Sequence, residues 1–491
     1  MAFLIPDTLD NLASPLFFVA RSHRVAGTKG RDMTNHAEAI AELKDLLGDR
    51  LSQGQSVRET HSHDEAYTTP VLPDAVAFPE STQEVSEIVK ICARHKCPIV
   101  AYGVGSSLEG HVVPVKGGVS LNMMGMNKVL AIHAEDLDAV VQPGVTRTEL
   151  NTELRDTGLM FTVDPGADAT MGGMAATRAS GTNSVRYGTM RENVLALEVV
   201  TADGSIIRTG TRAKKSSAGY DLTHLFVGSE GTLGIITELT VRLFGQPESI
   251  SAATCAFEDI DNAVQSVILA IQIGLPMARI ELIDEVQIKA LNSYNDSFDL
   301  PEKPHLFLEF HGSPAGVAEQ VESFKDIAED LGATDFEWAK KTEDRNRLWA
   351  ARHNAYYAAR SLRPQGSAVL TDCCVPISAL ADCIRIAKDK IAEAGLISPI
   401  VGHVGDGNFH LQILIDPEDE VEFSAAKALA SELNHVAIEH EGTVTGEHGV
   451  GLGKIAYMEA QNGAAYGVMA MLKRSMDPDN ILNPGKVVQI N

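Results

Sequence analysis

Glycine and hydroxyl residues are concentrated in three blocks of the chain, and these blocks restrict the possible folds most. They span residues 103–110, 165–188 and 228–234, and the first block follows a predicted strand that ends at Tyr102. Glycine permits positive φ, so that consecutive backbone N–H groups can converge on an anion such as a phosphate. The first block lacks the spacing G-x-G-x-x-G, and no helical pattern opens at its glycines. The sequence therefore argues against a Rossmann fold.

A glycine-rich turn that binds no ligand is the commoner explanation for any one such block. Three blocks within one domain instead predict an extended ligand that lies against the backbone. The surrounding pattern supports one domain, because short strands and helices alternate around the blocks. A helix at 82–95 has Ser81 as a plausible N-cap. Strands are predicted at 75–78, 98–102, 119–122, 129–133, 139–141, 196–201, 206–209 and 235–243, and then at 280–283 and 306–310.

Charge and cysteine usage exclude several classes of function. The formal net charge is −25, and because nucleic acids and anionic membranes bind basic faces, neither partner is expected. The six cysteines contain no C-x-x-C pair, so reduced thiols in the cytoplasm are the simplest interpretation. No apolar run reaches the roughly 18 residues of a membrane-spanning helix. A cytoplasmic protein is expected, with peripheral membrane association left open.

A predicted hairpin brings two histidines together. Two apolar strands flank Asp406-Gly407, which is the strongest short signal for a β-hairpin. With these residues as a two-residue turn, His403 pairs with His410 and both imidazoles project from one face. Opposed Cβ atoms lie about 4.5–5.5 Å apart, so that two imidazoles can reach one metal ion. A third ligand could come from Glu447, after a predicted strand at 443–445; histidines that only hydrogen-bond within the sheet are the alternative.

The segments AYGVGSSLEG, DPGADATMGGMAATRASGTNSVRYG and GSEGTLGIITELT resemble the FAD-binding domain of the vanillyl-alcohol oxidase type. The resemblance implies that the first loop binds the pyrophosphate and that the second flanks the isoalloxazine ring. Some relatives attach the flavin to a histidine of the first loop. Ser106 stands there, which implies non-covalent FAD. The residues implied to bind FAD are Tyr102, Gly103, Val104, Gly105, Ser106, Ser107, Gly110, Pro165, Gly166, Ala167, Thr170, Met171, Gly172, Gly173, Ser180, Gly181, Ser184, Tyr187, Gly188, Glu230, Gly231, Gly234, Ile235 and Asn483.

The same resemblance gives the expected fold class, α+β, and the domain organisation. A two-part FAD-binding domain is expected over residues 33–246, because the glycine-rich character ends near Phe244-Gly245-Gln246-Pro247. An α+β substrate domain, or cap, on an antiparallel sheet is expected over 247–450. Residues 451–491, with a helix at 464–476, are expected to return to the FAD domain. Residues 1–32 are expected to be a tail outside the fold, since Asp7 and Asp10 are unfavourable in a transit or signal peptide.

The segments GHVGDGNFH and GEHGVG resemble the C-terminal domain of FAD-linked 2-hydroxy acid dehydrogenases. The resemblance implies that His403, His410 and Glu447 bind zinc or manganese and that His448 is the catalytic base. The segments at 348–357 and 372–376 are most similar to the cytochrome-linked D-lactate dehydrogenases. By contrast, His435 and His440 lie on different faces of a helical stretch and are expected to be structural.

These resemblances predict oxidation of a small D-2-hydroxy acid, with D-lactate first among the candidates. The flavin would take a hydride from the substrate, while a metal acting as a Lewis acid lowers the pKa of the hydroxyl and His448 removes its proton. Arg352 is the candidate clamp for the substrate carboxylate, because a guanidinium matches that group in two contacts; an exposed helix arginine is the alternative. The acceptor could be cytochrome c, a quinone or an electron-transferring flavoprotein, and a homodimer is possible.

The sequence is also compatible with three other functions. The first is oxidation of D-2-hydroxyglutarate or glycolate; a second carboxylate would need another cation, and Arg345, Arg347 and Arg360 are near in sequence. The second is a metal-dependent hydrolase that uses the His-His-Glu site. The third is a non-catalytic FAD-binding protein, which would be yellow but would not be reduced by any hydroxy acid.

Overall fold

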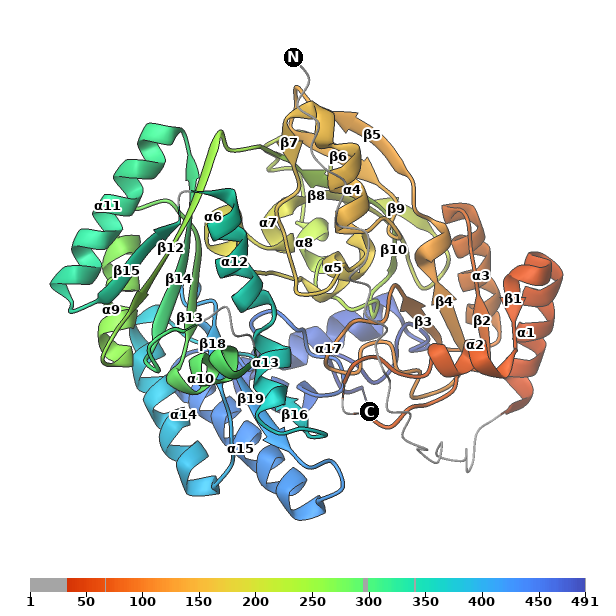
Figure 1. The fold of residues 1–491 in the computed structure, drawn as a ribbon. Coiled ribbons are helices and arrows are strands. Elements are labelled where there is room, and N and C mark those ends of the chain that lie inside the picture. Colours follow the sequence, from red (N-terminus) through yellow and green to blue (C-terminus); the bar gives the residue numbers. More distant parts are fainter. Residues whose placement is uncertain (1–32, 67, 295–298, 340, 491) are drawn as a thin grey trace.

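A computed structural model describes residues 33–66, 68–294, 299–339 and 341–490, in which two lobes face each other (Figure 1). One lobe is built on two small sheets and the other on one large antiparallel sheet. The expected α+β class, with a two-part first domain and an antiparallel second one, is confirmed. The tail predicted at 1–32 lies outside the described residues.

The lobe that is expected to bind FAD, here called the FAD lobe, comprises residues 33–66 and 68–245. Its first sheet is mixed and has the order β1-β2-β4-β3. Helices α1 (Met33–Leu47), α2 (Gln55–Thr60) and α3 (Thr82–Arg94) accompany β1 (Leu51–Ser52), β2 (Ala75–Ala77), β3 (Ile99–Tyr102) and β4 (Val119–Asn122). The predicted cap of α3 is confirmed, since Oγ of Ser81 accepts a hydrogen bond from the backbone N–H of Glu84. Apolar residues of α1 and α3 pack against this sheet as one core.

The second sheet of this lobe is antiparallel, with the order β5-β6-β10-β8-β9. Its strands are β5 (Val129–His133), β6 (Asp138–Val141), β8 (Val194–Val200), β9 (Ile206–Arg208) and β10 (Ile235–Arg242), and β7 (Leu159–Met160) pairs separately with β11 (Phe244–Gly245). The helices are α4 (Arg147–Glu153), α5 (Met171–Thr177), α6 (Ser184–Tyr187), α7 (Met190–Asn193) and α8 (Leu222–Phe226). The first glycine block follows β3, the second contains α5 and α6, and the third connects α8 to β10.

The cap sheet has eight strands, in the order β15-β12-β14-β13-β18-β19-β16 with β17 paired to β19. The strands are β12 (Ser249–Ala256), β13 (Met277–Ile283), β14 (His305–Gly312), β15 (Thr334–Ala339), β16 (Ser367–Leu370), β17 (Cys373–Cys374), β18 (Ile400–Gly402) and β19 (Asn408–Ile415). One core holds α9 (Ile260–Gln272), α11 (Pro314–Asp330), α14 (Leu380–Ala394) and α15 (Glu420–Glu439) on one face. A separate core holds α10 (Glu285–Tyr294), α12 (Thr342–His353) and α13 (Ala355–Ser361) on the other.

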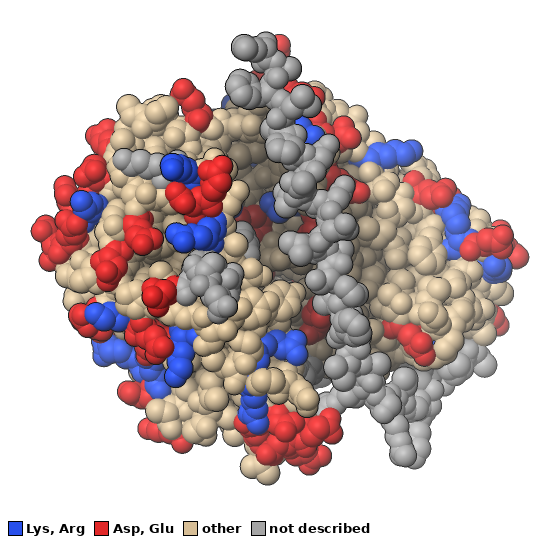
Figure 2. All heavy atoms as spheres, in the orientation of Figure 1, with Lys and Arg blue, Asp and Glu red and all other residues tan. Residues whose placement is uncertain are grey.

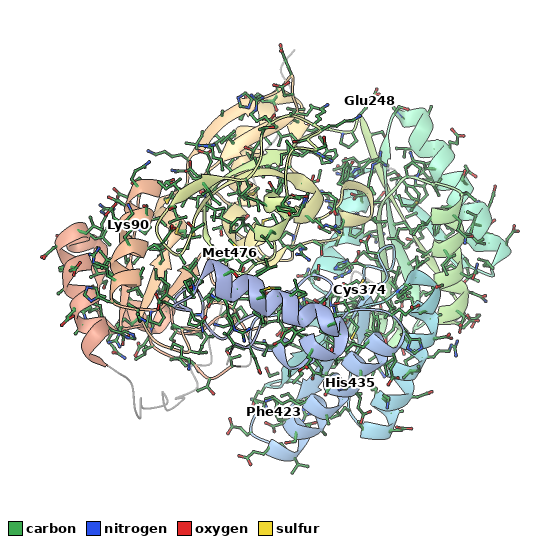
Figure 3. All side chains as sticks on the ribbon, turned by 180° about the vertical axis from the view of Figure 1, so that it is seen from behind. Lys90, Glu248, Cys374, Phe423, His435 and Met476 are labelled. Carbon is green, nitrogen blue, oxygen red and sulfur yellow. The ribbon has the colours of Figure 1, made fainter. Side chains whose placement is uncertain are left out.

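The C-terminal segment returns to the FAD lobe. This segment contains helices α16 (Met458–Asn462) and α17 (Ala464–Met476), and α17 lies across the back of the molecule (Figure 3). The backbone N–H of Ile99 then donates to the carbonyl of Ile481 over 2.7 Å, and that of Asn483 donates to the carbonyl of Ile99 over 2.8 Å. Among the described helices, none is both long and apolar enough to cross a membrane.

Candidate active site

The first glycine block has the shape of an anion-binding loop. Within the described part of the chain, no acceptor receives the backbone N–H groups of residues 104–107. Gly105 has φ +74°, and a Cβ at this position would overlap the hydroxyl of Tyr102. Only glycine therefore lets the loop pass so close to Tyr102 and leave its N–H groups free for a ligand. These free donors fit the pyrophosphate of a dinucleotide.

Several residues predicted to bind FAD shape the second block instead of presenting a free side chain. Thr170 caps α5 by accepting from the N–H of Gly173 over 3.3 Å. Oγ of Ser184 accepts from the N–H of Gly181 over 3.0 Å. The hydroxyl of Tyr187 lies 2.7 Å from Nδ1 of His311 in the cap. Pro165, Gly166 and Ala167 remain partly or fully exposed, as do Val104 and Ser106 in the first block.

Residues in and next to the third block mainly pack in the core and form hydrogen bonds with distant segments. Ile235 is a buried residue of β10, and a Cβ on Gly234 would overlap Val199. The amide of Asn483 donates to the carbonyls of His111 over 3.0 Å and of Glu230 over 2.8 Å. The Asn483 side chain is therefore engaged inside the protein, so that any contact of this residue with FAD falls to its backbone.

The predicted register of the histidine hairpin is wrong. Val401, not His403, is the partner of His410, and the connection runs over residues 403–407. A two-residue type I′ turn needs positive φ at both central residues, but only Gly407 of the pair Asp406-Gly407 has it, at +77°. His403 therefore lies in the loop, where its ring centroid is 5.4 Å from that of His410. The predicted strand at 443–445 is likewise reduced to a single bridge at Thr443.

The imidazoles converge on one carboxylate oxygen in spite of this shift. Oε1 of Glu447 lies 3.4 Å from Nε2 of His403, 3.2 Å from Nε2 of His410 and 3.5 Å from Nε2 of His448. The rings of His410 and His448 are stacked, with centroids 5.3 Å apart. Three histidines from two separate segments thus aim the same ring nitrogen at one point.

Hydrogen bonds on the far side of two rings fix which nitrogen carries the proton. Nδ1 of His403 donates to Oε1 of Glu281 over 2.7 Å, and Nδ1 of His410 donates to the carbonyl of Thr371 over 3.1 Å. In the neutral rings that a metal ion requires, the Nε2 atoms present lone pairs to Glu447, and among the described residues Nε2 of His410 is buried without a hydrogen-bond partner. Lone pairs that face a carboxylate repel it unless a positive charge lies between them.

This donor set fits a divalent metal ion. In a tetrahedral site with bonds of about 2.0–2.1 Å, ligand atoms lie about 3.3–3.4 Å apart, which matches the separations around Glu447. Ligand atoms of Asp372, His410, Glu447 and His448 also lie within 4.8 Å of one another. Imidazole and carboxylate ligands suit zinc and manganese alike.

Two buried acids in the site were not predicted from the sequence. Glu281 on β13 bridges His403 and Arg352. Asp372 accepts from the backbone N–H groups of Glu447 over 3.0 Å and of His448 over 2.8 Å. Its oxygens also accept from Asn408 and Thr445, so that it orients the loop at 446–448. A lone acid within an apolar strand, as in Arg279-Ile280-Glu281-Leu282, is the signal that could have revealed Glu281.

The charges of the site are strongly coupled. Burial alone would raise the pKa of Glu447, but the three histidines hold it well below its usual range. Burial alone would lower the pKa of His403, yet Glu281 and Glu447 raise it well above its usual range. Burial also acts to lower the pKa of His448, but the charges of Asp372 and Glu447 outweigh burial and raise this pKa to about 9. Buried acids thus favour positive charge at this centre.

Arg352 lies at the edge of the same network. Its Nε and Nη2 contact Oε2 of Glu281 over 2.8 and 2.7 Å, and the side chain is half-buried on α12. The alternative of an exposed helix arginine is therefore wrong, because the guanidinium is engaged by a buried acid. The structure places Arg352 next to the predicted metal ligands through Glu281.

The predicted flavin loops and the metal cluster meet at the boundary between the lobes. Oγ of Ser180 donates to Oε2 of Glu447 over 3.2 Å. A Cβ on Gly405 in the histidine loop would lie 2.7 Å from Cγ2 of Val185 in α6. The loops predicted to bind the isoalloxazine ring and the residues predicted to bind the metal thus form one continuous site.

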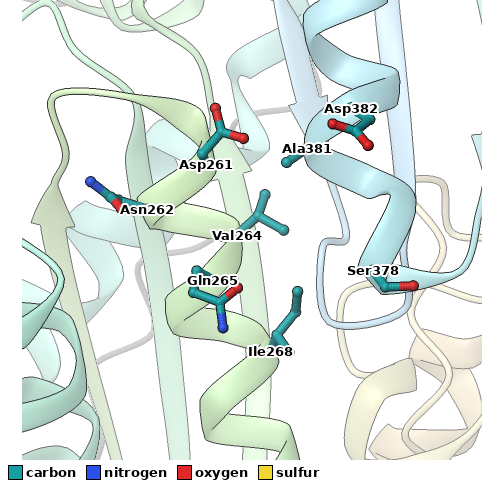
Figure 4. Close-up of a pocket in the computed structure, with 8 residues that line it drawn as sticks. All are labelled: Asp261, Asn262, Val264, Gln265, Ile268, Ser378, Ala381 and Asp382. Carbon is teal, nitrogen blue, oxygen red and sulfur yellow. The ribbon is translucent and has the colours of Figure 1, made fainter.

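Other surface features lie apart from this site. The pocket between α9 and α14 in Figure 4 is lined by Asp261, Asn262, Val264, Gln265, Ile268, Ser378, Ala381 and Asp382, none of which belongs to the flavin loops or the metal cluster. The face drawn in Figure 2 carries acidic and basic side chains side by side and no extended basic area. His435 packs its ring on Tyr457, and Nδ1 of His440 bonds the carbonyl of Val436.

Most of the chain is similar to known proteins. Residues 73–210 match the model of an FAD binding domain, and residues 246–487 match that of the C-terminal domain of FAD linked oxidases. A probable mitochondrial D-lactate dehydrogenase of Danio rerio is 50% identical, covering 92% of each chain. The mitochondrial D-lactate dehydrogenase [cytochrome] of Arabidopsis thaliana is 42% identical, covering 94% of this chain and 82% of its own. The glycolate oxidase subunit GlcD of Bacillus subtilis is 37% identical, covering 88% and 92%.

A solved structure, the 4-ethylphenol oxidase from Gulosibacter chungangensis, has a TM-score of 0.76 at 19% identity and covers 94% of this chain and 98% of its own. This likeness shows the shared fold. The curated relatives are FAD-linked oxidoreductases and favour that class over the hydrolase alternative. The chain therefore belongs to the family of FAD-linked oxidoreductases that includes the D-lactate dehydrogenases, and it carries the FAD-binding and C-terminal domains of that family.

Proposed function

We propose that the chain oxidises D-lactate to pyruvate, with FAD as the electron acceptor and with a divalent metal ion bound by His403, His410 and Glu447. The observation that carries this proposal is the convergence of three imidazole Nε2 atoms on Oε1 of Glu447, next to the flavin loop at Ser180. Relatives that are named D-lactate dehydrogenases and match most of the chain support the choice of substrate.

The roles of the chain's own residues follow from this geometry. When bound, FAD supplies an acceptor for the substrate hydride, and zinc or manganese supplies a positive charge that lowers the pKa of the substrate hydroxyl. His448 takes the hydroxyl proton, and for this its ring must be neutral. The acids around His448 favour the protonated ring, with a pKa of about 9. A cation bound beside His410 would lower the pKa of His448. The neutral His448 ring in turn would not repel that cation.

Side chains that contact the predicted metal ligands and the base hold them in position. Glu281 holds His403 in the tautomer whose Nε2 faces Glu447, and Asp372 holds the backbone of Glu447 and His448. Arg352 stays the proposed clamp for the substrate carboxylate. Glu281 occupies its Nε and Nη2, so that the substrate would be bound by the remaining edge of the guanidinium.

Oxidation of another D-2-hydroxy acid is the second candidate, because a relative named as a glycolate oxidase subunit is also similar over most of its length. The cations that a second substrate carboxylate would need lie in different settings. Arg345 is half-buried near Glu309, whereas Arg347 is exposed, and Nη2 of Arg360 donates to the carbonyl of Gly366 over 3.1 Å. A panel of D-lactate, glycolate and D-2-hydroxyglutarate distinguishes these substrates.

The electron carrier and the compartment are further proposals. The names of several relatives specify cytochrome, which supports cytochrome c over a quinone or an electron-transferring flavoprotein as the acceptor. Those names also specify mitochondria, so that they lend no support to the cytoplasmic location expected from the cysteines. We propose that the chain divides into domains at residues 33–246, 247–450 and 451–491 and that it forms a homodimer. Cell fractionation and sedimentation would test the location and the oligomeric state.

The decisive experiment is the visible spectrum of the purified protein without oxygen, before and after D-lactate is added, with L-lactate as the paired control. Bleaching of the flavin absorbance by D-lactate alone is expected. A flavin that D-lactate leaves oxidised while glycolate or D-2-hydroxyglutarate reduces it would replace the proposed substrate. A flavin that none of them reduces would contradict the proposed reaction.

A further inference from the structure

The loop that carries His448 is held by a buried carboxylate from each lobe. On its N-terminal side, Asp372 of the cap accepts from the N–H groups of Glu447 and His448. On its C-terminal side, Oε1 of Glu230 in the FAD lobe accepts from the N–H of Val450 over 2.6 Å, and Oε2 accepts from that of Gly451 over 2.9 Å. The loop is therefore fixed at both ends, and only one of its anchors belongs to the metal cluster.

Glu230 is constrained in its turn by the FAD lobe. It has φ +54°, an unfavourable conformation for a residue with a Cβ, and its side chain is only 2% exposed. Its own N–H donates to the carbonyl of Ala176 over 2.8 Å, and its carbonyl accepts from the amide of Asn483. Such strain persists only where the surroundings enforce it, which is typical of a functional position. Both carboxylate oxygens are directed at the loop, whereas the sequence predicts that Glu230 binds FAD.

His111 provides the counter-charge for this acid. It follows Gly110 at the end of the first glycine block, and its Nε2 lies 3.3 Å from Oε1 of Glu230 with the His111 side chain 5% exposed. Among the described residues, neither ring nitrogen meets the geometry of a hydrogen bond. Gly449, with φ +83°, passes so close that a Cβ there would lie 2.7 Å from Nε2 of His111 and 2.8 Å from Oε1 of Glu230. The imidazole and the acid thus enclose the residue next to His448.

We infer that His111 and Glu230 are positioning residues that hold the loop 446–451 from the FAD lobe and so place the imidazole of His448 for proton removal. The proposal rests on the proposed role of His448 as the base. It assigns to the pair a role in the reaction although neither residue touches the metal ligands. The first glycine block and the base are then linked through one chain of contacts, from Gly110 through His111 and Glu230 to Gly449.

The test compares FAD-loaded wild type with Glu230→Gln, His111→Ala and His111→Gln. His305→Gln is the matched control, because His305 is also a buried histidine, with Nδ1 bonded to the carbonyl of Lys303, but it lies in the cap away from this loop. The first readout is amide hydrogen exchange of peptides that cover residues 446–452. A glutamine can accept from only one of the two N–H groups, so Glu230→Gln is expected to accelerate exchange there about tenfold or more.

Kinetics supply the second readout. In FAD-loaded enzyme, Glu230→Gln and His111→Ala are expected to lower kcat about 10- to 100-fold with a smaller change in KM, because a displaced base weakens the transition state more than substrate binding. His111→Gln keeps a donor and is expected to recover part of the loss. The control should match wild type in both readouts.

Several outcomes would overturn the inference. Loop exchange that stays at the wild-type rate in Glu230→Gln, or kcat that stays unchanged per bound FAD while only thermal stability falls, would reduce the pair to a packing role. If wild type itself is not reduced by any hydroxy acid, the proposed function fails, but the exchange readout still decides whether the pair holds the loop.

Discussion

The two halves of the site are built from different material. The flavin half is made of backbone: no acceptor among the described residues receives the N–H groups of residues 104–107, and Gly105 gives the loop its shape. The metal half is made of side chains, in which His403, His410 and Glu447 converge from separate loops and strands. The flavin half therefore depends on the backbone conformations that glycine permits. The metal half depends on side chains that the buried acids Glu281 and Asp372 hold in place.

The largest effect should come from the base in the side-chain half. His448→Ala removes the group that takes the substrate proton, and flavin reduction is expected to slow by about two to four orders of magnitude while FAD stays bound. Rapid anaerobic mixing with D-lactate measures the rate. His435→Ala, which alters a histidine packed on Tyr457, is the control. A wild-type rate in His448→Ala would remove this residue from the role.

Loss of the central carboxylate should be nearly as severe. Glu447→Gln takes away the oxygen on which three imidazoles converge, so that bound metal should be lost and turnover should fall about 100- to 1000-fold. Elemental analysis of the purified protein and its rate of flavin reduction give the two readouts, with the exposed Glu459→Gln as a control. Retained metal and retained turnover together would refute the proposed site.

Beside β13, outside both halves of the site, the cap carries a buried acid whose ionisation stability experiments can detect. Asp284, just after β13, is buried, and burial raises the pKa of its carboxyl to about 7. Because the folded pKa exceeds the unfolded one, its contribution to stability is fully present below about pH 4 and is lost as the pH rises through 7. Asp284→Asn keeps an acceptor for the N–H of Gln287 and does not ionise.

The stability of Asp284→Asn relative to wild type is therefore expected to rise by roughly 2–4 kcal/mol between pH 4 and pH 8. Urea unfolding at both pH values measures the difference. A difference that is the same at pH 4 and pH 8 would contradict the expected titration.

Removal of the acid behind one ligand should have a moderate effect. Glu281→Gln weakens the hydrogen bond that orients His403 and leaves Arg352 without its partner, so that metal affinity or turnover is expected to fall about 10- to 100-fold. Competition with a chelator measures the affinity. An unchanged affinity would show that the side-chain half does not need this support.

The smallest effect is expected in the backbone half. Gly105→Ala forces a Cβ into positive φ against Tyr102 and is expected to cost about 1–2 kcal/mol, seen as weaker FAD binding and a lower melting temperature. Gly467→Ala is the control of opposite sign, because Gly467 lies in α17 with open space around it and should gain about 0.5–1 kcal/mol. Equal behaviour of the two variants would mean that shape is not what the first glycine block contributes.

Features that depend on a few neighbouring residues could be predicted from the amino-acid sequence. The cap of α3, the strands β4 and β5 and the helix α17 follow from local patterns, and the contiguous motifs indicated the family before any contact was known. Short-range rules suffice there because capping, alternation and positive φ are properties of a few successive residues.

The hairpin register and the buried acids of the site depend on contacts between distant segments and emerged from the folded structure. Asp406 lacks the positive φ that the predicted hairpin register needs, and Glu281, Asp372 and Glu230 hydrogen-bond to residues far away in the chain. The role of a buried acid depends on its hydrogen-bond partners. These partners lie on strands and loops that come into contact only when both lobes have folded. Long-range hydrogen bonds of this kind have no local signature, which is why the supports of the site appeared only with the fold.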